Sequence, residues 1–273
     1  MQDTGLLSRL ELLAKRNHAR VGIGIGVPTK KMITACEKAS EFADVVLVGV
    51  ESEIQIIGTS LEIIDTAEAP KTLVELLSDG KIDAAVRGTL GASSTLSNLK
   101  KIFKVDKIHR LALLTTADGK PFFLAPVGID EGTTLKDKVD FICKGAEHIN
   151  RLGTVPKVAI ISGGRLEDFG RDLYVDKTLA DAVFLVSRAK SMGIDAKHYG
   201  ILIEDAIKEA NFLLAPDGVS GNLIFRTLVF LGGGDGIGAP VLMEKVFIDT
   251  SRVGGHFTQS IMLASALVKV DSD

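Results

Sequence analysis

The sequence has 273 residues, 46% of them hydrophobic, which is enough apolar material for one large core or two modest ones. Its 32 basic and 35 acidic residues leave a formal net charge of −3, so no overall positive field would hold a nucleic acid or an anionic bilayer. Tryptophan is absent and aromatic residues make up 5%, which leaves little material for stacking on bases.

The amino-terminal segment, Gly5 to Arg20, has the charged amphipathic pattern of a surface helix rather than the apolar centre of a signal peptide. No run of ~18 uncharged apolar residues follows, so we expect no membrane span and a cytoplasmic protein. Cys36 and Cys143 lie within helical patterns, far from C-x-x-C spacing, and we expect both to be reduced and mostly buried. The cysteines therefore predict no metal site.

Strand and helix patterns alternate through the first hundred residues. The continuous apolar run Val45–Val50 is typical of a parallel strand buried on both faces. The glycines of the strand 20–26 are spaced G-x-G-x-G, which fits a tight strand exit better than a dinucleotide-binding loop. The alternation predicts an α/β fold with a mostly parallel sheet built by right-handed crossovers. Further strands or strand-like pieces are predicted at 54–57, 61–64 and 82–86, and helices at 29–42 and 69–78.

The segment that follows the strand 82–86 could bind an anion. Arg87 and Gly88 precede a helix start that contains Ser93 and Ser94, and such a start offers backbone N–H groups and hydroxyls to a negative charge. The Arg87 guanidinium could bind a carboxylate or a phosphate, or it could equally fill the space that a ligand needs. The alternative function for the two serines is capping of the helix.

A second domain is predicted from 107 to 243, inserted into a first domain made of 1–106 and 244–273. It begins with two apolar strands around Ala117-Asp118-Gly119-Lys120, the pattern of a tight antiparallel hairpin. Strands are then predicted at 158–161, 196–199 and 211–215, and helices at 133–152, 176–192 and 203–210. The strand 246–248 and a last helix at 257–266 return to the first domain.

Polar residues follow the strand 158–161. Ser162 and Arg165 are candidates for binding a phosphate or a nucleotide tail, because contacts to a charged group are about twice as strong as neutral ones. The alternative is a solvated turn in which Arg171 pairs with Asp168 or Asp172.

The segment from Pro216 to Gly255 carries the remaining candidates. Asn222, with Gly221, is predicted to open an amphipathic helix after the turn at 216–218. Gly234 and Gly236 belong to a glycine-dense loop, 232–238, that would let the backbone approach a ligand closely. A polar cluster, D-T-S-R, then follows the strand 246–248, and ligands of α/β folds bind at such strand ends.

The order P-D, G-N at a helix start, a G-x-G-x-P turn and D-x-S-R-x-G in this segment resembles the phosphate acetyl- and butyryltransferases. The segments 83–95 (D-A-A-V-R-G-T-L-G-A-S-S-T) and 156–162 (P-K-V-A-I-I-S) extend the resemblance over most of the chain. Departures at several site positions make it most similar to the archaeal branch called methanogenesis marker protein 4 or Mtx subunit X. The resemblance implies two Rossmann-like α/β domains with a ligand cleft between them, and a homodimer.

That family exchanges acyl groups between coenzyme A and phosphate, so the resemblance implies coenzyme A or a phosphate-containing anion as the ligand. At the matching positions Arg252 would clamp phosphate, Ser251 would hydrogen-bond the acyl oxygen or the thiol, and Asp249 would orient Arg252. The family aspartate that is thought to take the thiol proton is matched here by Thr258, which cannot act as a base at neutral pH. His256 is the titratable substitute in this segment.

Two functions therefore stay open. The first is a transferase that acts on coenzyme A with phosphate, or on a related phosphorylated or thiol ligand, in a methanogenic archaeon. The second is an accessory subunit of a corrinoid-dependent methyltransferase system, with methyltransferase subunits as partners and no acyl transfer. The missing aspartate favours the second function, whereas the retained D-T-S-R favours some ligand. No corrinoid-binding D-x-H-x-x-G occurs, so the chain is not expected to be a methyltransferase by itself.

Overall fold

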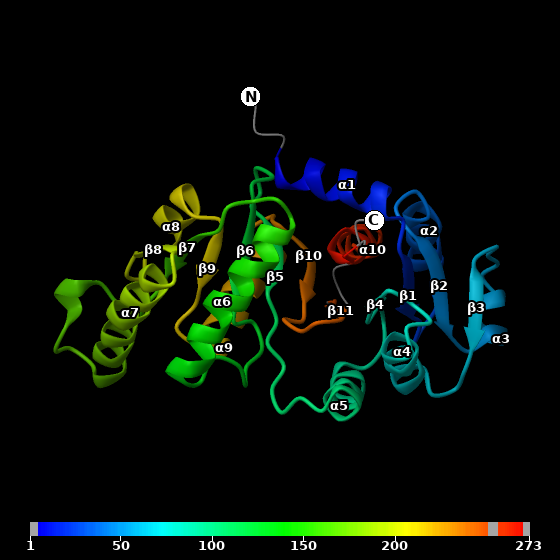
Figure 1. Ribbon diagram of the computed structural model, residues 1–273, viewed down its shortest axis with the longest axis horizontal. Helices are drawn as coiled ribbons and strands as arrows, with labels where there is room; N and C mark the ends of the chain where they lie inside the picture. The colour runs from blue at the N-terminus through cyan, green and yellow to red at the C-terminus, as the bar shows by residue number, and fades with distance from the viewer. Residues whose placement is uncertain (1–4, 251–255, 270–273) are drawn as a thin grey trace. The chain divides into compact units, whose positions relative to one another are not determined.

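The computed structural model describes residues 5–250 and 256–269. The chain divides into two compact units, Met1–Ile108 with Gly236–Asp273, and His109–Asp235 (Figure 1). The boundaries expected from the sequence were 106/107 and 243/244. The part of the glycine-dense segment from Gly236 onward therefore belongs to the first unit.

The first unit is built on a mostly parallel sheet with strand order β3-β2-β1-β4-β11-β10. Its central strands β1, β2 and β4 are buried almost throughout, as the apolar runs predict for parallel strands covered on both faces. Only β10 runs antiparallel to its neighbour, β11. The strands span β1 Arg20–Gly24, β2 Asp44–Gly49, β3 Glu62–Asp65, β4 Ala84–Val86, β10 Asp235–Pro240 and β11 Val246–Asp249.

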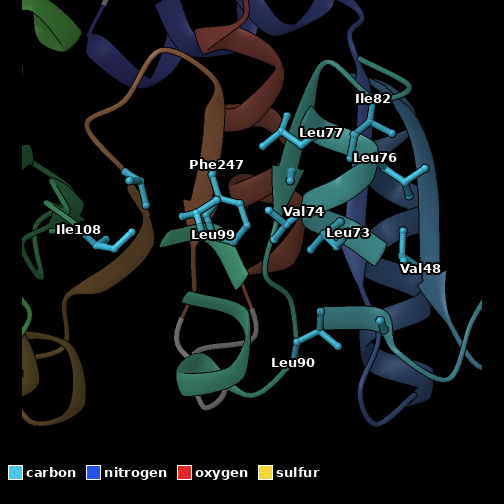
Figure 2. Close-up of a cluster of buried hydrophobic side chains, with 13 residues drawn as sticks. Val48, Leu73, Val74, Leu76, Leu77, Ile82, Leu90, Leu99, Ile108 and Phe247 are labelled. Atoms are coloured by element: carbon cyan, nitrogen blue, oxygen red, sulfur yellow. The ribbon is translucent and has the colours of Figure 1, made fainter. Parts of the chain in front are cut away.

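Helices cover both faces of this sheet. On one face, α4 and α5 pack against β4 and β11 through a core that includes Leu73, Leu99 and Phe247 (Figure 2). On the other, α10 lies against α1, α2, β1 and β4, and nine of its eleven residues are buried. The helices span α1 Leu6–Asn17, α2 Lys30–Ala39, α3 Glu51–Gln55, α4 Ala69–Ser78, α5 Ala92–Phe103 and α10 Phe257–Leu267.

In the second unit, the strands lie in the order β5-β6-β9-β7-β8. The antiparallel pair β5–β6 is the predicted hairpin, and the other pairs are parallel. Its strands are β5 Ala112–Thr115, β6 Pro121–Ala125, β7 Lys157–Ile160, β8 Asp195–His198 and β9 Phe212–Leu214. Its helices are α6 Leu135–Arg151, η1 Leu166–Asp168, α7 Leu173–Ser191, α8 Ile203–Glu209 and α9 Gly218–Phe230.

The α/β fold class predicted from the sequence is confirmed, and three local predictions are wrong. The piece 54–57 lies at the end of α3 rather than in a strand, which buries Ile54 and leaves Ile56 83% exposed. Helix α9 begins three residues before Gly221, because the Asp217 side chain accepts a hydrogen bond from the Ser220 N–H and caps it there. Half of the expected glycine loop forms β10. In the described ranges, no helix has the length and apolar character needed to cross a bilayer.

Candidate functional site

Arg87 lies at the carboxyl end of β4 and is 4% exposed. Its Nε donates to the carboxylate of Asp249, Nη1 donates to the carbonyl oxygen of Leu90 at 2.6 Å, and Nη2 donates to the carbonyl oxygen of Thr250. All three nitrogens therefore have acceptors in the chain itself. The guanidinium holds the ends of β4 and β11 together, and binding of a ligand by Arg87 stays a prediction.

Asp249 ends β11 and pairs with Arg87, which the sequence did not predict. The expected partner Arg252, and Ser251 with it, lie outside the described residues. The Arg87–Asp249 pair joins residues 162 positions apart in the chain, so no local motif could have indicated it.

The loop that follows β4 is packed tightly against the loop that follows β1. Gly88 has a positive φ of 61°, and a Cβ there would lie 2.1 Å from the carbonyl oxygen of Gly24, so only glycine fits. Thr89 Oγ1 accepts hydrogen bonds from the backbone N–H groups of Gly26 and Val27 at 2.9 and 3.2 Å. The backbone at this sheet edge is thus fixed, and the start of α5 is placed directly beyond it.

Helix α5 begins without a side-chain cap. Its N-cap residue is Gly91, and its first turn contains no acidic residue. The Ser94 and Thr95 hydroxyls both donate to the carbonyl oxygen of Gly91, at 3.0 and 2.8 Å, so the capping function considered for the serines is wrong. Among the described residues, no acceptor meets the backbone N–H groups of Ala92, Ser93 and Ser94. These N–H groups and the positive end of the helix dipole favour an anion at this point.

Ser162, after β7 in the second unit, is 1% exposed and bonded within the chain. Its hydroxyl oxygen lies 2.8 Å from the carbonyl oxygen of Gly164 and 2.8 Å from Nε2 of His198. A carbonyl only accepts, so both contacts are hydrogen bonds when Ser162 donates to Gly164 and the His198 Nε2–H donates to Ser162. Burial lowers the pKa of His198, which favours this neutral ring. His198 was not among the residues predicted from the sequence, although it ends the strand adjacent to β7.

Arg165 lies on the wall of a hollow of about 430 Å³ formed by the loop after β7, the end of β8 and α8. The ion pair expected in the alternative of a solvated turn is confirmed, because Arg171 pairs with Asp168 at 2.5 Å. Three basic and three acidic residues line the hollow, so the lining has no net charge with which to select an anion: Arg165, Lys197 and Lys208 against Glu167, Asp205 and Glu209.

Asn222 and Gly234 have partners within the second unit. The Asn222 side chain donates to the carbonyl oxygen of Val127 at 2.8 Å. The Gly234 N–H donates to the carbonyl oxygen of Leu228 at 3.0 Å, and a Cβ at Gly234 would lie 2.3 Å from the carbonyl oxygen of Thr115. Gly236, by contrast, is part of β10 in the first unit. The Gly234 N–H is thus occupied, and binding roles for these three residues stay predictions.

His256 is the N-cap residue of α10, is half-buried, and makes no side-chain cap hydrogen bond to the helix. Thr258, in the first turn, donates from Oγ1 to the carbonyl oxygen of Ala35 at 2.8 Å. The residue at the position of the expected aspartate therefore joins α10 to α2. In the part of the chain that the structure describes, no three His, Cys, Asp or Glu side chains are grouped so as to hold a metal ion.

Comparisons with known proteins agree with this architecture. The chain is 59% identical over 271 residues to a Methanosarcina mazei protein named "Putative methyltransferase mtx subunit X", covering 98% of this chain and 97% of that protein. It is 26% identical over 274 residues to the phosphate butyryltransferase of Clostridium acetobutylicum, covering 84% and 85% of the two chains. No protein-family profile matches the sequence.

Solved structures with the same fold include the EutD phosphotransacetylase of Staphylococcus aureus, with a TM-score of 0.70 at 17% identity, covering 97% of this chain and 98% of that one. A branched-chain phosphotransacylase of Enterococcus faecalis has a TM-score of 0.74 at 15% identity, covering 91% and 99%. At these identities the likeness establishes the fold.

Proposed function

Because the chain belongs to the Mtx subunit X family, whose more distant relatives include phosphate acyltransferases, we propose that it binds a phosphorylated ligand of the acyl phosphate or coenzyme A class. The observation that carries the proposal is the uncapped start of α5, where three backbone N–H groups lack acceptors among the described residues. A phosphate oxygen there would accept from the N–H groups of Ser93 and Ser94 and from the Ser93 hydroxyl. The carboxyl end of β4 directly precedes this turn, the position at which α/β folds bind ligands.

The test places a negative charge where the phosphate would lie. Ser93→Asp adds a carboxylate to the first turn of α5, which competes with an anion but favours the helix itself through its dipole. We expect affinity for coenzyme A and acetyl phosphate, measured by isothermal titration calorimetry, to fall at least ~10-fold while thermal stability is kept or raised.

Ser97→Asp is the matched control, since Ser97 is exposed one turn further along the same helix. It should leave affinity within ~2-fold of the unmodified protein, because the dipole effect falls off beyond the first turn. Equal losses in both variants, or no binding of either ligand by the unmodified chain, would contradict the proposal.

If the bound ligand reacts, the expected reaction is acyl transfer between coenzyme A and phosphate. The thiol sulfur would attack the acyl carbon of an acyl phosphate, the bond from that carbon to the phosphate oxygen would break, and the thiol proton would pass to a base. By position in the sequence, Arg252 would stabilise the leaving phosphate, Ser251 would hydrogen-bond the acyl oxygen, and His256 would accept the proton. A thiol-release assay with acyl-coenzyme A and phosphate measures the reverse direction, and Arg252→Ala should abolish it.

The second candidate function is that of an accessory subunit in a corrinoid-dependent methyltransferase system. Thr258 favours it, because the residue at the expected aspartate position cannot take a proton and is used to join α10 to α2. Relatives named as methyltransferase subunits also support this function. Absence of turnover, together with co-purification of a methyltransferase subunit from native cells, would favour it over acyl transfer. For either function we propose a cytoplasmic homodimer.

A further inference from the structure

The connections that follow β7 and β8 run in opposite directions across the sheet. β7 connects through α7 to its outer neighbour β8, whereas β8 connects through α8 to β9, on the far side of β7. Because connections between parallel strands are right-handed, α7 and α8 lie on opposite faces of these strands. In α/β folds, ligands bind at the carboxyl ends of the strands beside such a reversal, which here are β7 and β8.

The hollow of about 430 Å³ on whose wall Arg165 lies is at this point. Its volume is within the ~300–1,000 Å³ that is usual for ligand pockets. The two loops that form it are locked together, because the Ser162 N–H donates to the carbonyl oxygen of Gly200 at 2.8 Å. Gly200 has a positive φ of 62°, and a Cβ there would lie 3.2 Å from the carbonyl oxygen of Gly164. The loops thus give the hollow a fixed floor.

Four of the six charged side chains that line the hollow are paired with one another. Lys197 Nζ donates to the Glu209 carboxylate at 2.8 Å, and the Tyr199 hydroxyl donates to the same oxygen at 2.8 Å. Lys208 Nζ donates to the Asp205 carboxylate, also at 2.8 Å. These four charges therefore largely cancel and add little attraction for a charged ligand.

The other two charged residues are Arg165 and Glu167, and neither forms an ion pair among the residues that the structure describes. They stand two positions apart in the same loop, so one positive and one negative charge are left open on the wall. A simple anion would be attracted by Arg165 and repelled by Glu167. A ligand that carries one charge of each sign would pair with both.

His198 adds a hydrogen-bond acceptor to the same wall. The neutral ring donates from its Nε2–H to Ser162, which leaves Nδ1 as an acceptor. Within the described ranges Nδ1 has no hydrogen-bond partner, and it is not one of the side-chain atoms that are buried without a partner. Its lone pair is therefore open to solvent and can accept from an N–H group such as that of an ammonium ion.

Apolar surface lies beside these polar groups. Leu166, which separates Arg165 from Glu167 in the sequence, is 66% exposed, and Leu202 and Tyr199 line the same hollow. An aliphatic group bound here would remove apolar surface of the leucines from water, which favours binding. The hollow thus combines an open guanidinium, an open carboxylate, an acceptor nitrogen and an apolar wall.

We infer that this hollow binds an aliphatic α-amino acid, whose carboxylate pairs with Arg165 and whose ammonium group donates to the Glu167 carboxylate and to Nδ1 of His198. A guanidinium can hold a carboxylate through two parallel hydrogen bonds. The aliphatic side chain lies against Leu166 and Leu202. The site belongs to the second unit and does not depend on the ligand proposed for the start of α5.

The experiment is equilibrium dialysis of the full chain against radiolabelled L-leucine, for which we expect a dissociation constant on the order of 0.1–1 mM. Two competitors each lack one of its charges. 4-Methylpentanoate has no ammonium group, and 3-methylbutylamine has no carboxylate. Each should compete at least ~10-fold less well than unlabelled L-leucine, because each leaves one charged hydrogen-bonding group of the wall without a partner.

Two variants separate the two charges of the ligand. Arg165→Gln should weaken binding of L-leucine at least ~10-fold. Glu167→Gln should weaken binding of L-leucine but not of 4-methylpentanoate, which has no ammonium group to lose a contact. Arg171→Gln is the matched control, since Arg171 lies in the same loop, pairs with Asp168 and is not among the residues that line the hollow. It should leave the affinity within ~2-fold of that of the unmodified protein.

Circular dichroism melting of each variant checks folding, which substitutions of these exposed side chains should preserve. The inference is overturned if the unmodified chain does not bind L-leucine at ~5 mM, or if 4-methylpentanoate or inorganic phosphate competes as well as L-leucine. Equal affinities of Arg165→Gln and Arg171→Gln would also overturn it. Coenzyme A should not displace L-leucine, and Arg165→Gln should bind coenzyme A as the unmodified protein does. The amino acid site and the proposed ligand site at α5 can therefore fail independently.

Discussion

The buried pair of Arg87 and Asp249 joins two strands at the edge where the first unit places its candidate site. Removing one member of a buried ion pair costs ~3–5 kcal/mol, because the charge that remains has lost its compensation. Arg87→Ala would leave the Asp249 carboxylate, which is 7% exposed, without this guanidinium. We expect urea unfolding at 25 °C to show a loss of that size.

Arg171→Ala is the control, because its ion pair with Asp168 has side chains 75% and 25% exposed. Exposed pairs contribute ~0–1 kcal/mol, so this variant should stay within that range. A loss of less than ~1 kcal/mol in Arg87→Ala would show that Arg87 does not hold the two strand ends together.

His148 makes the stability of the protein depend on pH. Burial lowers the pKa of this histidine to about 4, whereas the unfolded chain titrates near ~6.5. The folded state therefore binds a proton at His148 less readily than the unfolded state does. The free energy of unfolding is highest above pH ~6.5 and decreases as the pH falls towards 4. The loss amounts to ~3 kcal/mol over this window.

His148→Leu should flatten this dependence, and among the described residues the buried Nδ1 of His148 has no hydrogen-bond partner that the substitution would remove. The measurement is the free energy of unfolding in urea at intervals from pH 4 to 7, compared between variant and unmodified chain so that other groups cancel. Leu12→Ala, at a position that is 65% exposed, removes no titratable group and should leave the slope unchanged. Parallel curves for His148→Leu and the unmodified protein would rule out this origin of the pH dependence.

At the scale of elements, a substitution at Gly221 tests how α9 is attached to the rest of the second unit. Alanine favours a helix over glycine by ~1 kcal/mol, yet a Cβ here would lie 1.8 Å from the carbonyl oxygen of Pro126. Steric overlap should prevail, so Gly221→Ala should destabilise the protein by ~1–3 kcal/mol in urea unfolding. A Cβ at Gly5 would meet no atom of the described residues within 4 Å, so Gly5→Ala should change stability by less than ~0.5 kcal/mol. A stabilised Gly221→Ala variant would mean that the close approach is absent.

Elements whose signal lies in their own residues could be predicted from the sequence. The apolar run Val45–Val50 gives β2, and Thr134 with Asp137 forms a reciprocal capping box at the start of α6. The glycines near Gly236 could not be placed, because β10 depends on antiparallel pairing with β11. The segment after β4 was predicted from its polar residues to bind an anion. The partners of Arg87 could not be predicted, since Asp249 and Thr250 come from a distant part of the sequence.

At the scale of the whole molecule, the second unit has the features of a domain that folds alone. It is one continuous segment, His109–Asp235, that contains five strands and the helices α6 to α9. Four of its phenylalanines are among the largest fully buried side chains of the chain: Phe122, Phe123, Phe141 and Phe212. A separate core of this kind is the physical requirement for independent folding. The first unit, by contrast, is made of two segments that only the complete chain brings together.

We therefore expect a fragment comprising residues 109–235 to unfold cooperatively in urea, with a single transition seen by circular dichroism and by amide hydrogen exchange. Phe212→Ala in the fragment should lower the free energy of unfolding by ~3–5 kcal/mol, because Phe212 is fully buried in the core. Val155→Ala is the comparison, since Val155 is 72% exposed and should change it by less than ~0.5 kcal/mol. A fragment without a cooperative transition, or one in which the two substitutions cost the same, would show that this core forms only within the complete chain.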